Sequence, residues 1–509
     1  MTVANAMVLV DQTAVPLALP SIMGEFGIDS QLAQWVLSAS LLPLAGLLVL
    51  GGRLGDLLGR RRVFVVGAAV FAGASALAGL SPTIELLLAF RVLQGAAGAL
   101  MLPTTIAIVS ASFATRDRGR ALGTMGGAAA VAGAFGPVLG GGLTAVLGWR
   151  SVLLVNVPLA LLAVVVARHA IPKDPARRDQ SPVDVAGATL LCLALVGLIV
   201  GLAQSQDWGW RSPGVLLSLT ASAAAAALFI LVEHRAADPL MDFGLLRRHR
   251  NYLAATISQA IAGMAEMGLG LIFPLVLILN LGMDPGLAGL ALIPATLPMV
   301  VMAPIAGRWY DSVGGRKPLV VGFLVLALAG VALAAGTAVS STSYWTMLPG
   351  LLTFGTGLAI VLTVNDPVSL DMVPEQHHGQ ASGVSATAEQ FGGALGIATF
   401  YLIFHATYVD RFVTNVSESS LADLSDAQVE RFEQDIQKAE QTGLNPDTFD
   451  PALNPYLSAA QDASYVGYTV VFLLLSGLAA AAVILMSRLV RRPEPAPGAS
   501  GTVDREAPG

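Results

Sequence analysis

The chain has 509 residues, of which 55% are hydrophobic and only 12% are charged. Soluble domains carry about 45 to 50% apolar and about 25% charged residues, so this composition indicates a polytopic membrane protein. The lone cysteine, Cys192, excludes a disulfide framework and a thiolate metal cluster. The net charge of -6 decides little, because the placement of charges matters more than their sum in a membrane protein. We expect no cleavable signal peptide, since the first apolar segment begins almost at Met1 without a basic lead.

Fourteen apolar segments have the length of about 20 residues that a bilayer requires of a helix. They cover 3–23, 32–52, 62–81, 84–110, 120–146, 151–169, 183–204, 213–233, 251–279, 286–306, 318–338, 345–368, 380–405 and 464–487. The 28 lysines and arginines fall mostly on one face of this topology. That bias predicts that this face and both termini lie in the cytoplasm.

A polar stretch between the second and third segments recurs half a chain later. In it, Gly52, Arg53, Asp56 and Gly59 are repeated as Gly307, Arg308, Asp311 and Gly314. The chain therefore predicts two copies of one helical unit, as in many secondary transporters. Glycine and aspartate before a run of arginines indicate a tight turn where one helix ends, with the carboxylate capping the next helix.

The repeat divides the chain into parts. We predict an all-α membrane protein with an N-terminal six-helix bundle (1–170), two inserted transmembrane helices (171–235), a cytoplasmic linker (236–250), a C-terminal six-helix bundle (251–487) and a cytoplasmic tail of disordered composition (488–509). An extracellular loop is expected at 406–463, and its stretch LSDAQVERFEQDIQKAEQTG predicts a short amphipathic helix.

Two charged residues stand within apolar segments of the first half. Asp11 lies at the centre of the first segment and Arg91 in the fourth, where a charge costs about 2.5 to 3.5 kcal/mol on insertion scales. Arg91 shares a helix face with Gln94, Gly95 and Gly98. Each charge therefore needs a partner or a function: a role with protons or substrate is one interpretation, and a structural ion pair is the other.

The second half carries Glu266 in the middle of a segment, Glu389 within another, and Asp366 near a cytoplasmic end, where it suits a helix-end group. Met264 and Met267 beside Glu266 suit an adaptable apolar wall of a substrate cavity, with a lipid-facing position or core packing as the alternative. Glu375, His377 and His378 lie together in a cytoplasmic loop, and we predict no metal site there.

Several of these motifs resemble those of the major facilitator superfamily. The stretch Gly52-x-Leu54-x-Asp56-x-x-Gly59-Arg60-Arg61-Arg62 resembles its loop between helices 2 and 3, and the Arg91 motif resembles its fourth-helix motif. Small residues on one helix face let backbones touch, and Gly136-Pro137-x-x-Gly140-Gly141 resembles the antiporter motif of the export branch, with Ala132 in place of a leading glycine.

The first-helix motif narrows the resemblance to fourteen-span drug:proton antiporters. It reads Asp11-x-Thr13-x-Val15-x-x-Ala18-Leu19-Pro20, with Pro16 where that family has asparagine, and we expect Pro16 to kink the helix. Trp149-Arg150, Asn156-x-Pro158 and Pro239-Leu240-x-Asp242 are also similar to this branch. Glu389 stands where many relatives carry a basic residue.

The resemblance implies the major facilitator fold, with two six-helix repeats plus two inserted helices. We predict proton coupling by Asp11, Arg91, Glu266 and Glu389. The predicted substrate cavity contains Asp11, Glu266, Met264, Met267 and Gln94. By resemblance, the gating residues are Gly52, Asp56, Gly59, Arg60, Arg61 and Asp311.

Together these features predict a proton-coupled antiporter in a bacterial inner membrane that exports hydrophobic or cationic drugs by alternating access. Export of a lipid, siderophore or endogenous antibiotic is the alternative, and a polytopic membrane enzyme or a channel is more remote. The sequence has no His-Glu-x-x-His, no Gly-x-Ser-x-Gly in any span and no phosphate-binding Gly-Lys-Ser/Thr loop. We expect no cofactor besides the proton gradient, no nucleic-acid partner, and a monomer in the bilayer.

Overall fold

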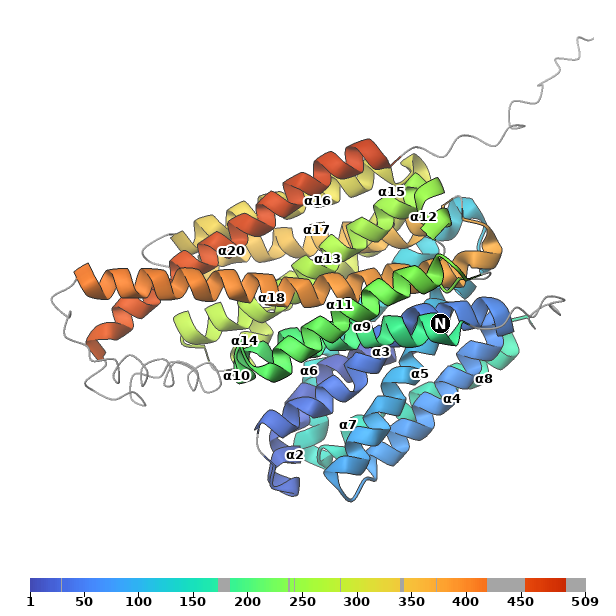
Figure 1. The fold of residues 1–509 in the computed structure, drawn as a ribbon, viewed down its shortest axis with the longest axis horizontal. Coiled ribbons are helices and arrows are strands. Elements are labelled where there is room, and N and C mark those ends of the chain that lie inside the picture. The colour runs from blue at the N-terminus through green and yellow to red at the C-terminus, as the bar shows by residue number, and fades with distance from the viewer. Residues whose placement is uncertain are drawn as a thin grey trace, which may run out of the picture.

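The computed structural model describes residues 1–28, 30–172, 184–236, 239–241, 243–283, 285–338, 343–371, 373–418 and 454–490. Within these ranges the chain is built from helices, without a β-strand. Figure 1 shows them as two groups of long helices with the green pair α9 and α11 beside them.

The first group contains α1 (Thr2–Ala14), η1 (Val15–Ala18), α2 (Leu19–Phe26), α3 (Ser30–Leu58), α4 (Arg60–Gly79), α5 (Ile84–Ser112), η2 (Thr115–Asp117), α6 (Arg118–Leu147), α7 (Arg150–Leu154) and α8 (Asn156–Ala170). Next come α9 (Val185–Ala203), α10 (Ser205–Trp208), α11 (Pro213–Glu233) and α12 (Phe243–Arg248). The second group contains α13 (Arg250–Leu275), the π-helical turn η3 (Val276–Asn280), α14 (Pro285–Ala291), α15 (Ile293–Val313), α16 (Arg316–Ala338), α17 (Tyr344–Leu370), η4 (Glu375–His377), α18 (His378–Glu418) and α20 (Asn454–Leu489).

Thirteen helices in the described part are long and apolar enough to cross a membrane. They match thirteen of the fourteen predicted spans. The remaining predicted span, 120–146, coincides with α6, which has 30 residues.

The helices next to the predicted loop 406–463 are longer than the sequence indicated. α18 continues to Glu418 and α20 begins at Asn454, so both ends of that segment are helical. Hydropathy falls where Asp410 and Arg411 appear, but the helix continues. Its aromatic rings Phe404, Tyr408 and Phe412 stack at successive turns, with centroids 6.0 and 6.1 Å apart. The predicted amphipathic helix in this loop lies outside the described residues.

Pro16 interrupts the first membrane segment, as predicted. α1 ends at Ala14, a 3-10 turn covers Val15–Ala18, and α2 resumes at Leu19. Proline has no backbone N–H to continue the α-helical ladder. The kink follows Asp11 by about one turn.

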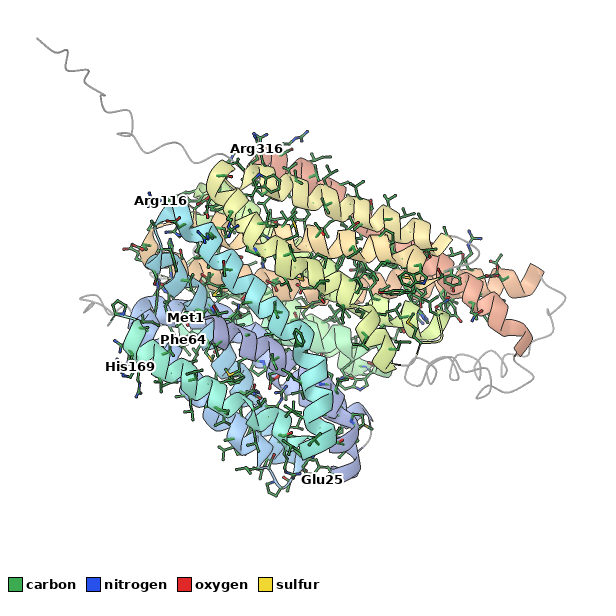
Figure 2. The ribbon with its side chains drawn as sticks, turned by 180° about the vertical axis from the view of Figure 1, so that it is seen from behind. Met1, Glu25, Phe64, Arg116, His169 and Arg316 are labelled. Atoms are coloured by element: carbon green, nitrogen blue, oxygen red, sulfur yellow. The ribbon has the colours of Figure 1, made fainter. Side chains whose placement is uncertain are left out.

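Buried apolar side chains form separate cores in the two groups. One core draws on residues between Ala254 and Val490, and two others draw on residues between Ala4 and Ala167. The groups approach each other at the end that carries Met1, Arg116 and Arg316 (Figure 2), called the arginine-rich end below. They diverge toward the opposite end. Between the groups, α9 contacts α3 of the first and α18 of the second.

Candidate functional site

A buried ion pair lies inside the first group of helices. Arg91 Nη1 of α5 lies 2.6 Å from Asp11 Oδ2 of α1, and the two side chains are 1% and 5% exposed. Each charge therefore compensates the other within an apolar bundle. The structure thus brings together two of the residues predicted for proton coupling.

The other nitrogens of Arg91 also donate hydrogen bonds. Its Nε donates to the Val36 carbonyl at 3.0 Å, Nη2 donates to Ser40 Oγ at 2.8 Å, and Nη1 donates also to Gln94 Oε1 at 2.7 Å. The guanidinium is therefore held in one orientation by α1, α3 and its own helix.

The second carboxylate oxygen of Asp11 accepts two amide hydrogen bonds. Gln94 Nε2 donates to Oδ1 at 3.0 Å and Asn156 Nδ2 of α8 donates to it at 2.8 Å. Gln94 Nε2 also donates to Ser75 Oγ of α4 at 2.9 Å. Asp11 is therefore the centre of a network that reaches five helices, and a change in its charge alters every one of these contacts.

Sequence reasoning did not assign Ser40, Ser75 and Asn156 to the site. All three are buried polar residues within apolar segments. Their polarity in these segments was the signal that could have marked them as site residues. Which of them meet depends on how the helices pack. A small cavity adjoins the network and is lined by Val8, Asp11, Gln12, Ser40, Leu44, Phe71, Gln94, Gly95 and Gly98.

Glycines on α5 explain why this network can form. A Cβ at Gly95 would overlap the Ser40 carbonyl, and a Cβ at Gly98 would lie 3.1 Å from Leu44 Cδ1. The backbones of α5 and α3 are therefore in contact along this face. That contact brings Arg91 within reach of Ser40.

The predicted antiporter motif packs α6 on the kinked part of the first segment. A Cβ at Gly136 would overlap Thr13 Oγ1, and one at Gly140 would overlap the Ala14 carbonyl. The predicted close contact of helix backbones is confirmed for these glycines. Gly141 lies beside Leu17, while the side chain of Pro137 lies outside the described part.

The second group repeats this packing, which the sequence analysis missed. On α18, a Cβ at Gly392 would overlap the Ala260 carbonyl of α13, and one at Gly396 would overlap the Met264 carbonyl. The spacing of Gly392 and Gly396 equals that of Gly136 and Gly140. This spacing was the signal that could have identified the counterpart.

Two further carboxylates lie near Glu389 in the second group. Glu389 of α18 accepts a hydrogen bond from Gln259 Nε2 of α13. Its charge interacts with those of Glu266 on α13 and Asp366 on α17. Glu266 Oε2 is buried and has no hydrogen-bond partner among the described residues. Glu266 and Glu389 are thus brought together, and Asp366, expected as a helix-end group, joins them.

Met264 and Met267 lie where α13 packs on α18. Met264 borders the apolar core of the second group, and a Cβ at Gly393 would overlap Met267 Sδ. This placement agrees with the core-packing alternative. Their role as a cavity wall stays a prediction.

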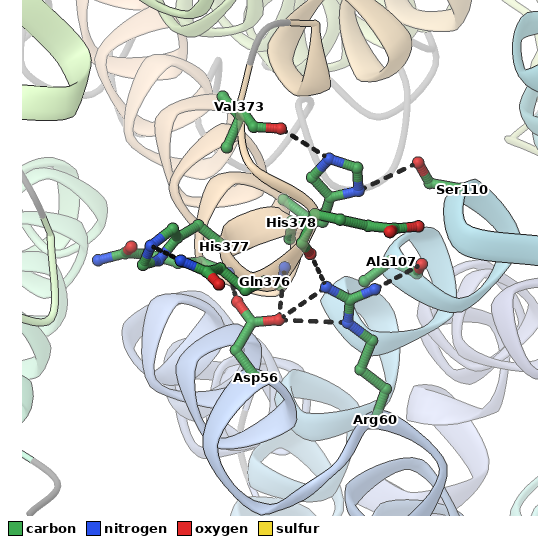
Figure 3. Close-up of polar contacts among 12 residues, drawn as sticks. Asp56, Arg60, Ala107, Ser110, Val373, Gln376, His377 and His378 are labelled. Carbon is green, nitrogen blue, oxygen red and sulfur yellow. Dashed lines mark hydrogen bonds and ion pairs between the residues drawn. The ribbon is translucent and has the colours of Figure 1, made fainter. Parts of the chain in front are cut away.

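The repeated polar stretch joins the two groups at the arginine-rich end (Figure 3). Asp56 of α3 accepts backbone hydrogen bonds from Gly379 at 3.1 Å and Gln380 at 2.7 Å, both in the first turn of α18. Arg60 donates to Asp56 Oδ1 through Nη2 at 3.0 Å. We call these contacts the Asp56 latch.

The predicted cap was therefore assigned to the wrong helix. Asp56 caps α18 of the other group, while α4, the next helix along the chain, has no side-chain cap hydrogen bond. The predicted tight turn is confirmed, because α3 ends at Leu58 and Gly59 has a φ of 100°, a region that favours glycine. Only the folded arrangement could reveal a partner that lies more than 300 residues away.

Neighbouring side chains fix this turn. Arg60 Nη1 donates to the Ala107 carbonyl at 3.3 Å and Nη2 donates to the Glu375 carbonyl. Arg61 Nη2 donates to the Arg168 carbonyl at 2.6 Å. His378 contacts the Val373 carbonyl and Ser110 Oγ through its two ring nitrogens (Figure 3). These contacts fix the start of α18 against α5.

The second copy of the stretch makes the matching contact in the opposite direction. Asp311 of α15 accepts backbone hydrogen bonds from Gly119 and Arg120 of α6, both at 2.8 Å. The glycines allow close approach in both copies: a Cβ at Gly52 would overlap the Gly379 carbonyl, and one at Gly307 would overlap that of Gly119. We call this second set the Asp311 latch.

Asp371, after the end of α17, lies beside the Asp311 latch. Its Oδ1 accepts a hydrogen bond from Tyr310 Oη at 2.5 Å. Burial raises the pKa of Asp371 to about 6, although the Tyr310 hydroxyl and the nearby charge of Arg118 act to lower it. This carboxyl therefore acquires its charge as the pH rises through about 6.

Comparison with known proteins gives consistent matches. Residues 1–397 match the family model described as Major Facilitator Superfamily. The chain is 35% identical to the tetracenomycin C resistance and export protein of Streptomyces glaucescens over 82% of this chain and 77% of that protein. It is 30% identical to the multidrug resistance protein Stp of Mycobacterium tuberculosis over 77% of this chain and 72% of that protein. The structure of the human organic anion transporter MFSD10 matches with a TM-score of 0.60 at 16% identity, covering 95% of this chain and 98% of that one.

Proposed function

The chain belongs to the major facilitator superfamily, and we propose that it exports hydrophobic or cationic small molecules across a bacterial inner membrane in exchange for protons. It is a multi-pass membrane transporter rather than an enzyme. The names of its relatives, which describe resistance to and export of antibiotics, support the direction and the substrate class.

The observation that carries the proton coupling is the buried Asp11 network. Ionised Asp11 accepts bonds from Arg91, Gln94 and Asn156. A proton on its carboxyl would remove the charge that these donors surround, and so would favour a different arrangement of α1, α5 and α8. Protonation and conformation are then linked, which is the requirement for exchange.

Alternating access is supported by the two latches. We propose that the six-helix bundles 1–170 and 251–487 move against each other, with 171–235 as the inserted pair. The arginine-rich end faces the cytoplasm in this proposal. With both latches formed at that end and the bundles diverging at the other, the arrangement fits the outward-facing state.

A substrate panel in everted vesicles tests this proposal. Adding a transported compound should release protons from acidified vesicles, with a rate that saturates with its concentration. Ion conductance without saturation, or transport that does not depend on the pH gradient, would contradict it.

A second candidate is export of an antibiotic made by the host cell itself, which the name of the Streptomyces relative favours. Secretion of the host's own antibiotic, measured in a strain that lacks this transporter, distinguishes the two. A loss of secretion would favour the second candidate.

Topology is the first prediction. In a Cys192→Ala background, cysteines placed at Gln206 or Ser419 should react with an impermeant maleimide added outside cells. Cysteines at Asp174 or Gln376 should be protected until the cells are opened. Gln376 is exposed at the arginine-rich end, so its protection reports the side of the membrane and not burial. Reversal of either pair would contradict the fourteen-span topology.

The second prediction concerns the Asp56 latch. Asp56→Asn replaces a charged acceptor of two backbone N–H groups and Arg60, and hydrogen bonds to charged groups contribute about 1.5 to 3 kcal/mol. We expect the ratio of outward-facing to inward-facing protein to fall about tenfold or more, with a lower transport rate and nearly unchanged substrate Kd. Fluorescence binding and vesicle flux measure the two. An equal loss of binding and flux would contradict a role in gating.

A further inference from the structure

A short segment between α11 and α12 contacts the Asp56 latch. Pro239, Leu240 and Met241 follow the inserted helix pair, and we call them the strap. Gln380 Nε2 donates to the carbonyls of Leu240 at 2.6 Å and Pro239 at 3.2 Å. The backbone N–H of the same Gln380 donates to Asp56 Oδ2. One residue therefore connects the strap with the latch.

The other end of the strap is held by the inserted helices. The Met241 N–H donates to Glu233 Oε2 at 3.1 Å, and Glu233 is the last residue of α11. Glu233 Oε1 and Asp184 Oδ2, the latter from the α9 N-cap, both lie close to Gly187. A buried carboxylate with a backbone donor is a strong, directional contact. The strap is therefore fixed to the end of α11, which packs against α9.

The side chain of Leu240 in the strap is also buried in an apolar core that both helix groups and the inserted pair share. Leu240 is 1% exposed and belongs to a cluster of buried apolar residues from both groups and the inserted pair, which includes Val49, Ala188, Phe229, Ala381 and Val384. Burying a leucine contributes about 1.5 to 3 kcal/mol. The polar and apolar contacts together hold the strap against the start of α18.

The inserted pair itself is seated on the helix that carries Asp56. A Cβ at Gly46 of α3 would lie 2.8 Å from Cys192 Sγ of α9. α9 also contacts α18. α9 of the inserted pair thus lies against both helices that form the Asp56 latch.

The Asp311 latch differs from the Asp56 latch. In the second copy, Gly315 stands where Arg60 stands in the first, so Arg60's bonds to Asp56 and to the Ala107 and Glu375 carbonyls have no arginine counterpart at that position. Among the contacts described above, only the Asp56 latch is joined to the strap, through Gln380. The two latches, although related by the repeat, are therefore stabilised differently.

We propose that the strap and Gln380 position the Asp56 latch, so that the inserted helix pair sets how readily the arginine-rich end opens. This rests on the alternating access of the proposed function but not on the identity of the substrate or on proton coupling. Gln380, Leu240 and Glu233 are positioning residues: they act through the latch and not on the transported compound.

The test is a double-mutant cycle on the full chain in lipid nanodiscs, without substrate or gradient. Spin labels on Leu58→Cys and Gln376→Cys, in a Cys192→Ala background, report the distance across the latch. Gln380→Leu removes the side-chain donors and keeps the backbone N–H. It should raise the ratio of open to closed populations roughly fivefold or more, since two neutral hydrogen bonds are lost. In an Asp56→Asn background, the same change should have little further effect.

Two results would overturn the proposal: no population change in Gln380→Leu, or an equal change with and without Asp56. A matched pair at the far end of the strap covers the case in which Gln380→Leu fails to fold. Glu233→Gln keeps an acceptor for the Met241 N–H and should behave as the unaltered chain, whereas Glu233→Met should open the latch. Equal behaviour of the two Glu233 variants would also contradict it. Because the test uses no transported compound, its result can still be interpreted if the export proposal is wrong.

Discussion

Asp11→Asn should abolish pH-driven export of every substrate while leaving substrate exchange in place. Exchange of labelled for unlabelled compound requires only that the loaded carrier reorients, whereas accumulation against a gradient requires the proton. Coupling free energies are typically 1 to 3 kcal/mol, so losing the pH-driven component should lower the total accumulation ratio about 5- to 150-fold. Vesicle uptake with and without an imposed pH gradient measures both quantities.

The control for this variant must separate a loss of proton coupling from a loss of folding stability. Removing one member of a buried ion pair costs about 3 to 5 kcal/mol, because Arg91 would remain as an uncompensated charge. The double variant Asp11→Asn with Arg91→Gln removes both charges and should recover most of the lost thermal stability. It should still lack pH-driven export. If Asp11→Asn retains full pH-driven export, Asp11 does not carry the proton.

The charged residues of this site could be predicted from the sequence because the free-energy cost of placing a charge in an apolar segment identifies them. A charge in an apolar segment needs compensation, so Asp11 and Arg91 could be identified as partners or functional residues before their 2.6 Å contact was known. The glycine spacing likewise predicted close helix contacts. Such inferences depend on the local sequence and on the apolar surroundings of each helix.

Other contacts could not be predicted because they join residues far apart in the sequence. Asp56 was expected to cap its own neighbour, but its carboxylate accepts hydrogen bonds from N–H groups in the first turn of α18. The link from Gln380 to the strap depends on how the inserted pair packs. Polar residues such as Asn156 are visible in an apolar segment, but the helix that they face is set by the fold.

The extent of α18 illustrates a different limit. Hydropathy marks where a helix leaves the apolar region and not where its hydrogen bonding ends. Asp410 and Arg411 follow His405, yet the helix continues to Glu418, with rings stacked from Phe404 to Phe412. Span length and helix length are therefore separate quantities in this protein.

Glu266→Gln should impair export of cationic substrates and spare neutral ones. The Glu266 carboxylate has a buried oxygen without a hydrogen-bond partner among the described residues and lies near Glu389, which in turn lies near Asp366. A cationic substrate would offset this concentration of negative charge. A charge-assisted contact contributes about 1.5 to 3 kcal/mol, so the apparent affinity for cations should fall about tenfold or more.

Glu389→Gln is the matched control, because the two carboxylates differ in their bonding. Glu389 accepts the Gln259 amide, so its replacement by glutamine turns a charge-assisted bond between α13 and α18 into a weaker neutral one and should lower the melting temperature. Glu266→Gln breaks no such bond and should leave the melting temperature nearly unchanged. Transport of one cationic and one neutral compound of similar size, measured in the same vesicles, separates charge recognition from folding. Equal loss for both compounds in Glu266→Gln would assign Glu266 to coupling instead, and Asp11 would then share the proton with the second bundle.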